Sequence, residues 1–257
     1  MALSARTIDL NVEVGESFGR WRGGDDDAVM DHVSSASVAC GYHAGDHNAM
    51  LHIAELGAAK SVELGAHPGY HDLLGFGYRT FDLSAQEIRA LMLYQIGALD
   101  AMLRSVGRRL HHVKPHGALY VQTLTDDEIA AAVVDAVASY DQGLVFYTTA
   151  QSVCEARARQ AGLPVVREFF ADRPLGPGGT LLVDWATYFD PTPENSAARA
   201  RQFLENGEVD AIDGSMVAIE AECICVHTDN PAGAAVAAGI AEALQADGYE
   251  LRAPART

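Results

Sequence analysis

The stretch Leu64-Gly-Ala-His67-Pro-Gly69 is a short β-type run that ends in a histidine framed by proline and glycine. The same order recurs in Val38-Ala-Cys-Gly-Tyr-His43-Ala-Gly-Asp46, in His112-Val-Lys-Pro-His116-Gly117 and in Ile224-Cys-Val-His227-Thr-Asp229. In α/β proteins, chemistry is carried on the turns that follow parallel strands. If these four strands lie parallel in one sheet or barrel, the four imidazoles reach the same end of it.

Strand-like and helix-like segments alternate outward from these motifs. Strands are predicted at Thr7–Val14, Ser37–Cys40, Val62–Ala66, His111–Lys114, Leu144–Thr148, Pro164–Phe169 and Ile224–Val226. Helices are predicted at Asn48–Ser61, from Ser84 to about Val106, from Thr125 to about Tyr140, from about Ser152 to Gln160, from Thr192 to about Gly207, and from Pro231 to Ala246.

Residues suited to capping mark several of these helix starts. Asp46 can cap the helix that follows it, and this is an alternative to a role in a site. Ser84-Ala-Gln-Glu87 and Thr125-Asp-Asp-Glu128 both have the spacing of a capping box. Thr192-Pro193-Glu194 places proline at the first helical position.

Six or seven βα units with short connections imply parallel strands and right-handed crossovers. A closed or nearly closed (β/α) barrel is therefore favoured, as a single domain over residues 1–257 without a separate linker. An open doubly wound sheet is the alternative. No G-x-G-x-x-G follows the first strand, and no G-x-x-x-x-G-K-[ST] P-loop is present, so the chain has no nucleotide-binding fingerprint of its own.

Composition narrows the class of protein. The net charge of −17 argues against a nucleic-acid partner, because phosphate binding needs clustered Lys and Arg. No apolar stretch approaches a membrane span, and Met1–Thr7 lacks the apolar core of a signal peptide. The four cysteines form no C-x-x-C pair, so they are expected to be reduced and partly buried. A cytoplasmic protein without a membrane partner is expected.

Polar residues alternate with apolar ones in the first predicted strand. Asp9, Asn11 and Glu13 share one face, because side chains alternate along a strand. One interpretation is an edge strand that faces solvent. The preferred one is an inward row that faces a site, because the strand leads directly into the glycine-rich run Gly15-Glu-Ser-Phe-Gly19.

Lys114-Pro-His116-Gly117 is the densest motif. A lysine at a strand end can hold a substrate carboxylate or phosphate, and burial can suit it to acid–base work. The alternative is a structural ion pair with a neighbouring carboxylate. His116 can move a proton near neutral pH, and the framing of His67 by proline and glycine suggests a similar role.

Further charged residues follow the later strands. Arg173 and Arg79 can each clamp a carboxylate, and Asp172, His227 and Asp229 lie at neighbouring strand ends. Clusters of His, Asp and Glu also bind divalent metals, but no H-E-x-x-H spacing is present, so a metal is left open. These residues by themselves suggest a hydrolase-like enzyme that uses His and carboxylate groups on a small, anionic substrate.

The motifs together resemble the LamB/YcsF family, which is the family of the A component of 5-oxoprolinase. The matching stretches occur in family order and cover residues 7 to about 250. They are Asp9-Leu-Asn-Val-Glu-Val-Gly-Glu16, Ser35-Ala-Ser-Val-Ala-Cys-Gly-Tyr-His-Ala-Gly-Asp46, Gly65-Ala-His-Pro-Gly-Tyr-His-Asp-Leu-Leu-Gly-Phe-Gly-Tyr-Arg79, Tyr94-Gln-Ile-Gly-Ala-Leu99, His112-Val-Lys-Pro-His-Gly-Ala-Leu-Tyr120, Glu168-Phe-Phe-Ala-Asp-Arg173 and Ile224-Cys-Val-His-Thr-Asp-Asn-Pro231.

The resemblance implies a (β/α)7-type barrel similar to the glycoside hydrolase/deacetylase fold. It also implies ATP-dependent hydrolysis of 5-oxo-L-proline to L-glutamate, together with partner subunits B and C. The sequence departs from the family pattern at Glu13, where Asp is usual, at Tyr78, where Arg is common, and at Thr228, where Gly is common. These departures bear on substrate preference more than on fold.

We therefore expect the partner subunits to bind most of the ATP, because this chain lacks a P-loop. Candidate catalytic residues are Glu13, His43, His67, Lys114 and His116. Candidate substrate-binding residues are Asn11, Arg79, Asp172, Arg173, His227 and Asp229. Two rivals stay open: a metal-dependent deacetylase or amidohydrolase that acts alone, and a non-catalytic subunit that only binds the lactam.

Overall fold

A closed barrel of parallel strands forms the centre of the computed structural model, which describes residues 6–182 and 190–256. Its seven strands are β1 (Arg6–Val14), β2 (Ser35–Ala39), β3 (Glu63–His67), β4 (His112–Val113), β5 (Val145–Thr148), β6 (Val165–Phe170) and β9 (Cys223–Val226). Each strand pairs in parallel with the next, and β9 pairs with both β6 and β1. This last pairing closes the barrel. It confirms the predicted (β/α)7-type barrel and excludes the open doubly wound sheet.

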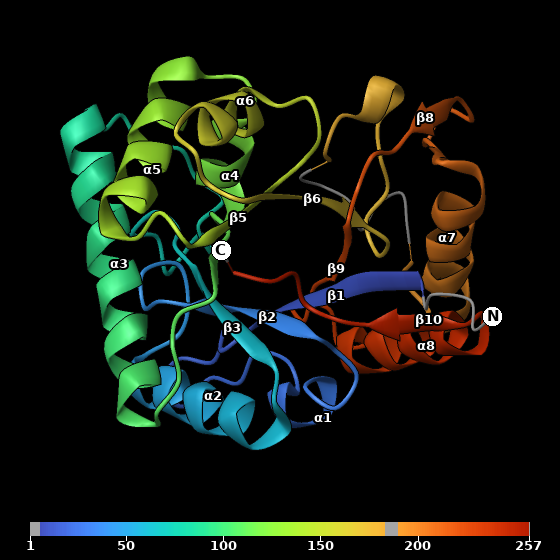
Figure 1. Ribbon diagram of the computed structural model, residues 1–257, viewed down its shortest axis with the longest axis horizontal. Helices are drawn as coiled ribbons and strands as arrows, with labels where there is room; N and C mark the ends of the chain where they lie inside the picture. The colour runs from blue at the N-terminus through green and yellow to red at the C-terminus, as the bar shows by residue number, and fades with distance from the viewer. Residues whose placement is uncertain (1–5, 183–189, 257) are drawn as a thin grey trace.

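Helices surround the barrel on its outside (Figure 1). They are α1 (Asp26–Val29), α2 (His47–Lys60), α3 (Ala85–Ser105), α4 (Gly117–Thr123), α5 (Asp127–Tyr140), α6 (Val153–Gln160), α7 (Pro193–Asn206) and α8 (Gly233–Ala246), with a 3-10 turn η1 at Pro177–Gly179. The longest, α3, buries the apolar stripe predicted from its 3.6-residue period, which includes Ile88, Met92 and Leu99. The main apolar core therefore lies between the strands and this ring of helices.

The capping predictions have mixed outcomes. The side chain of Asp46 accepts hydrogen bonds from the backbone of Asn48 and Ala49, and Ser84 forms the predicted capping box with Glu87. The box predicted at Thr125 is wrong. Asp126 caps α5 instead, because its carboxylate accepts from two backbone N–H groups of the first turn and is a charged acceptor at the positive end of the helix.

Several short elements were not predicted. Strands β7 (Glu208–Asp210) and β8 (Met216–Ala218) form an antiparallel pair outside the barrel, and β10 (Tyr249–Leu251) adds to the amino-terminal part of β1. After β10, the chain crosses the amino-terminal end of the barrel, where the carbonyl of Pro254 lies 2.7 Å from Nε2 of His111. In Figure 1 this final segment passes in front of the strands.

From Ile8 onward, strand β1 is buried on both faces. Asp9, Asn11 and Glu13 are 1%, 0% and 6% exposed, so the edge-strand interpretation is wrong. Inside the barrel, the hydroxyl of Tyr147 donates to Asp9 at 2.7 Å, and Asn11 bonds to hydroxyl groups of β2. A hydrogen-bonded polar network thus occupies part of the barrel interior, and Glu13 lies beyond it toward the carboxyl-terminal end.

Two further expectations concern cysteines and membranes. Cys40, Cys154, Cys223 and Cys225 are all free and buried. Among the described residues, every helix is too short or too polar to cross a bilayer.

Candidate functional site

Glu13 lies at the centre of a charged cluster at the carboxyl-terminal end of the barrel. Its Oε1 atom is 2.9 Å from Nζ of Lys114, 3.3 Å from Nε2 of His67 and 3.5 Å from Nε2 of His227. Burial by itself would raise the pKa of Glu13, but these three neighbours hold it well below its usual range. The structure therefore keeps a carboxylate charged in a nearly solvent-free place.

Lys114, directly after β4, is enclosed by acceptors. Its Nζ is 3.0 Å from Glu168 Oε2 on β6 and 2.9 Å from Cys225 Sγ on β9, in addition to Glu13. The ammonium also lies 5.0 Å from the centre of the Phe170 ring. Burial by itself would lower the pKa of Lys114, but the cysteine and the two glutamates raise it well above its ordinary value. The ion-pair alternative thus describes the contacts that Lys114 makes in this structure.

His227 is held by Asp172. The Nδ1 atom of His227 lies 3.0 Å from Asp172 Oδ1, and the backbone N–H of His227 donates to Oδ2 at 2.9 Å. Because a carboxylate only accepts, Nδ1 carries the hydrogen and Nε2 points toward Glu13. Burial would raise the pKa of Asp172, but His227 and Arg173 lower it. Arg173 in turn contacts Asp229 at 2.5 Å.

Three more histidines lie beside Glu13. His67 and His116 face one another, with 3.0 Å between Nε2 of the first and Nδ1 of the second. The ring of His43 is stacked on that of His116 at a centroid distance of 3.7 Å. Burial, reinforced by neighbouring histidines, lowers the pKa of His43 well below its usual value and that of His116 to about 3. Burial also raises the pKa of Glu16, which lies near His43.

An open cavity of about 590 Å³, measured out to solvent, reaches this cluster. Its polar wall includes Glu13, Lys114, His116, Arg173 and His227, and its apolar wall includes Tyr120, Phe170, Leu181 and Leu182. An open cavity with an apolar wall and a few convergent charged groups is typical of a site for a small molecule.

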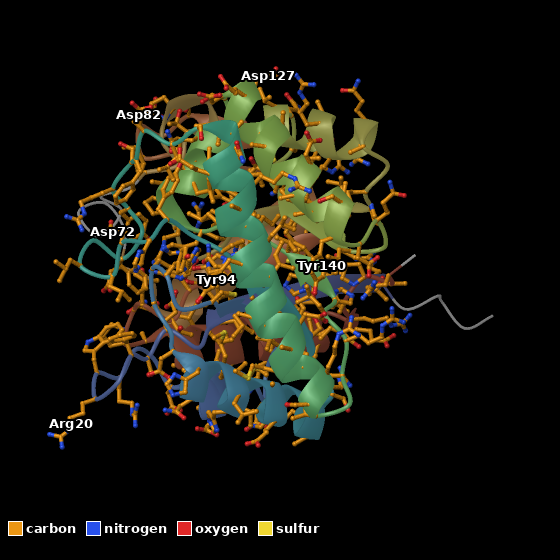
Figure 2. All side chains as sticks on the ribbon, turned by 90° about the vertical axis from the view of Figure 1, so that its left-hand side faces the viewer. Arg20, Asp72, Asp82, Tyr94, Asp127 and Tyr140 are labelled. Atoms are coloured by element: carbon orange, nitrogen blue, oxygen red, sulfur yellow. The ribbon has the colours of Figure 1, made fainter. Side chains whose placement is uncertain are left out.

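The structure brings together most, but not all, of the residues singled out from the sequence. Asn11 lies within the barrel, bonded to Ser35 and Ser37. Arg79 does not line the cavity. It pairs with Asp72, and its side chain is 61% exposed. Figure 2 shows Asp72 on the same side of the molecule as the labelled Arg20 and Asp82.

Sequence reasoning missed Glu16 and Cys225 as members of the cluster. Glu16 follows β1 by two residues, so its place after a strand end was a usable signal. Cys225 gave no such signal, because a buried cysteine on a strand is ordinarily a core residue. Its contact with Lys114 depends on the closure of β9 against β1.

Known proteins resemble this chain over nearly its whole length. The profile of the LamB/YcsF family matches residues 8–257. The A component of 5-oxoprolinase from Thermus thermophilus is 44% identical over 251 residues, which cover 96% of this chain and 99% of the relative. The crystal structure of a lactam utilization protein, also from Thermus thermophilus, is 42% identical, has a TM-score of 0.89, and is matched over 96% of this chain and 99% of that chain.

A more distant structure shows the fold alone. A protein of Enterococcus faecalis named for cellobiose-phosphate cleavage has a TM-score of 0.51 at 13% identity, over 97% of each chain. The profile match and the level of identity to the 5-oxoprolinase component, by contrast, extend to the sequence of the site. This chain therefore belongs to the LamB/YcsF family.

Proposed function

We propose that this chain is a component of an ATP-dependent 5-oxoprolinase that hydrolyses 5-oxo-L-proline to L-glutamate. The proposal rests on one observation, the cavity that is lined by Glu13, Lys114 and His227. It combines a buried carboxylate with cationic and imidazole groups, the set of groups needed to bind an anionic lactam and move protons on it. The identity of 44% to a 5-oxoprolinase component supports the choice of substrate.

We assign binding of the lactam carboxylate to the cationic wall of the cavity. Arg173 and Lys114 both line it, whereas Arg79 lies outside it. A guanidinium group can hold a carboxylate with two parallel hydrogen bonds. The apolar wall around Phe170 and Leu181 then contacts the ring methylenes of the lactam.

Ring opening needs activation, because a lactam carbonyl is a poor electrophile. ATP phosphorylates the lactam oxygen, a first water adds to the activated carbon, and the carbon–nitrogen bond breaks with proton transfer to nitrogen, which leaves an acyl phosphate. A second water hydrolyses the acyl phosphate and releases phosphate. ATP, 5-oxoproline and two waters thus give ADP, phosphate and glutamate. Since the chain has no P-loop, partner subunits B and C bind most of the nucleotide.

We assign proton transfer to the residues around Glu13. Glu13, kept charged, accepts the proton of the attacking water and passes it to Nε2 of His227, which lies 3.5 Å away. His227, held by Asp172 through Nδ1, then gives that proton to the ring nitrogen. Lys114 stabilises negative charge that develops on the reacting carbonyl. The direct acid–base roles expected for His67 and His116 stay a prediction, as does the cytoplasmic location.

The test is 5-oxoproline-dependent phosphate release by the three-subunit mixture, with glutamate measured in parallel. Glu13→Gln should lower turnover by about 100-fold or more, the scale of a lost general base. Glu250→Gln, at the exposed residue of strand β10, is the matched control. Wild-type rates for Glu13→Gln, or for both His67→Ala and His116→Ala, would show that the site is assigned wrongly.

Two results would favour the rival functions. Ring opening by this chain alone without ATP would indicate an amidohydrolase. Full turnover by the partners without this chain, together with tight 5-oxoproline binding by it, would indicate a protein that only binds the lactam.

A further inference from the structure

Four side chains from four consecutive βα connections meet beside the cavity. Glu16 follows β1, His43 follows β2, His67 ends β3 and His116 precedes α4. All four are buried, and each offers one ligand atom within 4.8 Å of the others. Three imidazole nitrogens and one carboxylate oxygen are a ligand set that suits zinc and neighbouring transition metals better than magnesium or calcium.

The contact between His67 and His116 requires a positive centre. Nδ1 of His67 lies 2.8 Å from the carbonyl oxygen of Lys114, and Nε2 of His116 lies 2.7 Å from that of Phe76. A carbonyl oxygen only accepts, so both of these nitrogens carry hydrogen. In neutral rings, Nε2 of His67 and Nδ1 of His116 then carry lone pairs and no hydrogen, yet they lie 3.0 Å apart. A proton or a metal ion between them removes this repulsion.

His43 and Glu16 distinguish between these two possibilities. Neither ring nitrogen of His43 has a hydrogen-bond partner among the described residues, and the same is true of Oε1 of Glu16. Buried polar atoms are nearly always partnered, so three such atoms next to one another call for an explanation. A proton shared by His67 and His116 leaves all three without a partner, whereas an ion bound by the whole cluster is a partner for one nitrogen of His43 and for Oε1 of Glu16.

The surroundings resemble the outer shell of a metal site. Backbone carbonyls orient His67 and His116 through the nitrogens that face away from the cluster, as outer-shell acceptors do for ligating histidines. Two glycines beside the cluster also leave space for the imidazole rings of His43 and His116. A Cβ atom at Gly69 would lie 2.8 Å from Nδ1 of His43, and one at Gly77 would lie 2.7 Å from Cδ2 of His116. Only glycine leaves room for both imidazoles.

We propose that Glu16, His43, His67 and His116 bind one divalent transition-metal ion of the zinc class. The four ligand atoms lie within 4.8 Å of one another. Tetrahedral ligands about 2.0–2.2 Å from zinc lie roughly 3.3–3.6 Å apart, so the cluster contracts by up to about 1.5 Å when it binds the ion. His43 turns away from its stacked position on His116 to aim a nitrogen at the ion. The inference goes beyond the proposed reaction, and it is tested without turnover.

The experiment uses the untagged full chain, stripped with a chelator. Bound metal is measured after dialysis against Zn²⁺ by elemental analysis and calorimetry, and the coordination is examined with Co²⁺ through its visible absorption. We expect one ion per chain, d–d bands typical of nitrogen and oxygen ligands, and a rise in Tm on adding Zn²⁺.

His43→Ala and Glu16→Gln should weaken Zn²⁺ binding by roughly 10-fold to 100-fold or more. His47→Ala is the matched control, because His47 is an exposed histidine at the start of α2, which follows the same connection, and this variant should bind as wild type does. Glu16→Gln keeps the test decisive if His43→Ala fails to fold. Substoichiometric binding by the wild type, or equal binding by wild type and Glu16→Gln, would overturn the proposal, whatever the outcome of the 5-oxoproline assay.

Discussion

The ammonium nitrogen of Lys114 lies 2.9 Å from Oε1 of Glu13, and both side chains are almost completely buried. One end of this pair comes from β1 and the other from the residue after β4, so the contact joins opposite parts of the barrel wall. Glu168 on β6 adds a second carboxylate at 3.0 Å. Two buried carboxyl groups therefore contact one ammonium group.

Removing that shared charge should destabilise the protein strongly. Lys114→Met is expected to lower the free energy of unfolding by about 3–5 kcal/mol, because it removes the ammonium that both buried carboxylates contact. Urea unfolding followed by circular dichroism measures this loss. Lys60→Met is the control, since Lys60 pairs with Asp31 in a partly exposed ion pair and its loss should matter much less. Equal losses in the two variants would contradict the ion-pair account.

Loss of the hydrogen bond between Asp172 and His227 should affect kcat more than KM. Asp172→Asn replaces the acceptor that fixes the hydrogen on Nδ1 of His227, so kcat should fall roughly 10-fold to 100-fold while KM changes less. Steady-state kinetics of the three-subunit mixture give both parameters. Asp247→Asn, at the C-terminal end of α8, is the control. An unchanged kcat would remove His227 from the proposed proton path.

His112 should make stability depend on pH. Burial, together with the charges of His111, Lys114 and His67, lowers the pKa of His112 well below 6.5 in the folded state. As the pH falls below about 6.5, the unfolded chain binds a proton there that the folded chain does not, so stability is lost. His112→Gln should reduce the slope of unfolding free energy against pH, between about pH 6 and 5, by up to roughly 1.4 kcal/mol per unit.

The measurement for His112 is a series of urea titrations across that pH range. The variant has its own constant offset in stability, so only the slope is compared. His47→Gln, which removes an exposed histidine, is the control. Parallel slopes for wild type and His112→Gln would show that His112 does not carry this proton linkage.

A side chain at position 65 should clash with a neighbouring residue inside the barrel. A Cβ atom at this position would overlap the imidazole of His112 on the neighbouring strand. Gly65→Ala should therefore cost about 1–3 kcal/mol, and the cost should shrink when His112→Ala is combined with it. Gly97→Ala, in α3 with open space around it, should be neutral or slightly stabilising. A double-mutant cycle with no coupling would contradict this packing.

Much of the fold could be predicted from the sequence. The alternation of strand and helix signals, with short connections, indicated the parallel barrel, and each predicted barrel strand overlaps an observed one. The missed elements are short. Helix α1 has four residues, and β7, β8 and β10 have three each, too few to show a period. Helix α4 follows His116, whose side chain makes no capping bond, so no helix-start signal marked it.

The sequence by itself also determined where charged and imidazole groups lie along the chain, because alternation along a strand and the turn after it are local properties. Only the tertiary structure decided which of these groups meet. Arg173 reaches the cavity and Arg79 does not, and Lys114 contacts Glu13, Glu168 and Cys225 together. These contacts depend on how the barrel closes and in what register β9 pairs with β1, which no local pattern encodes.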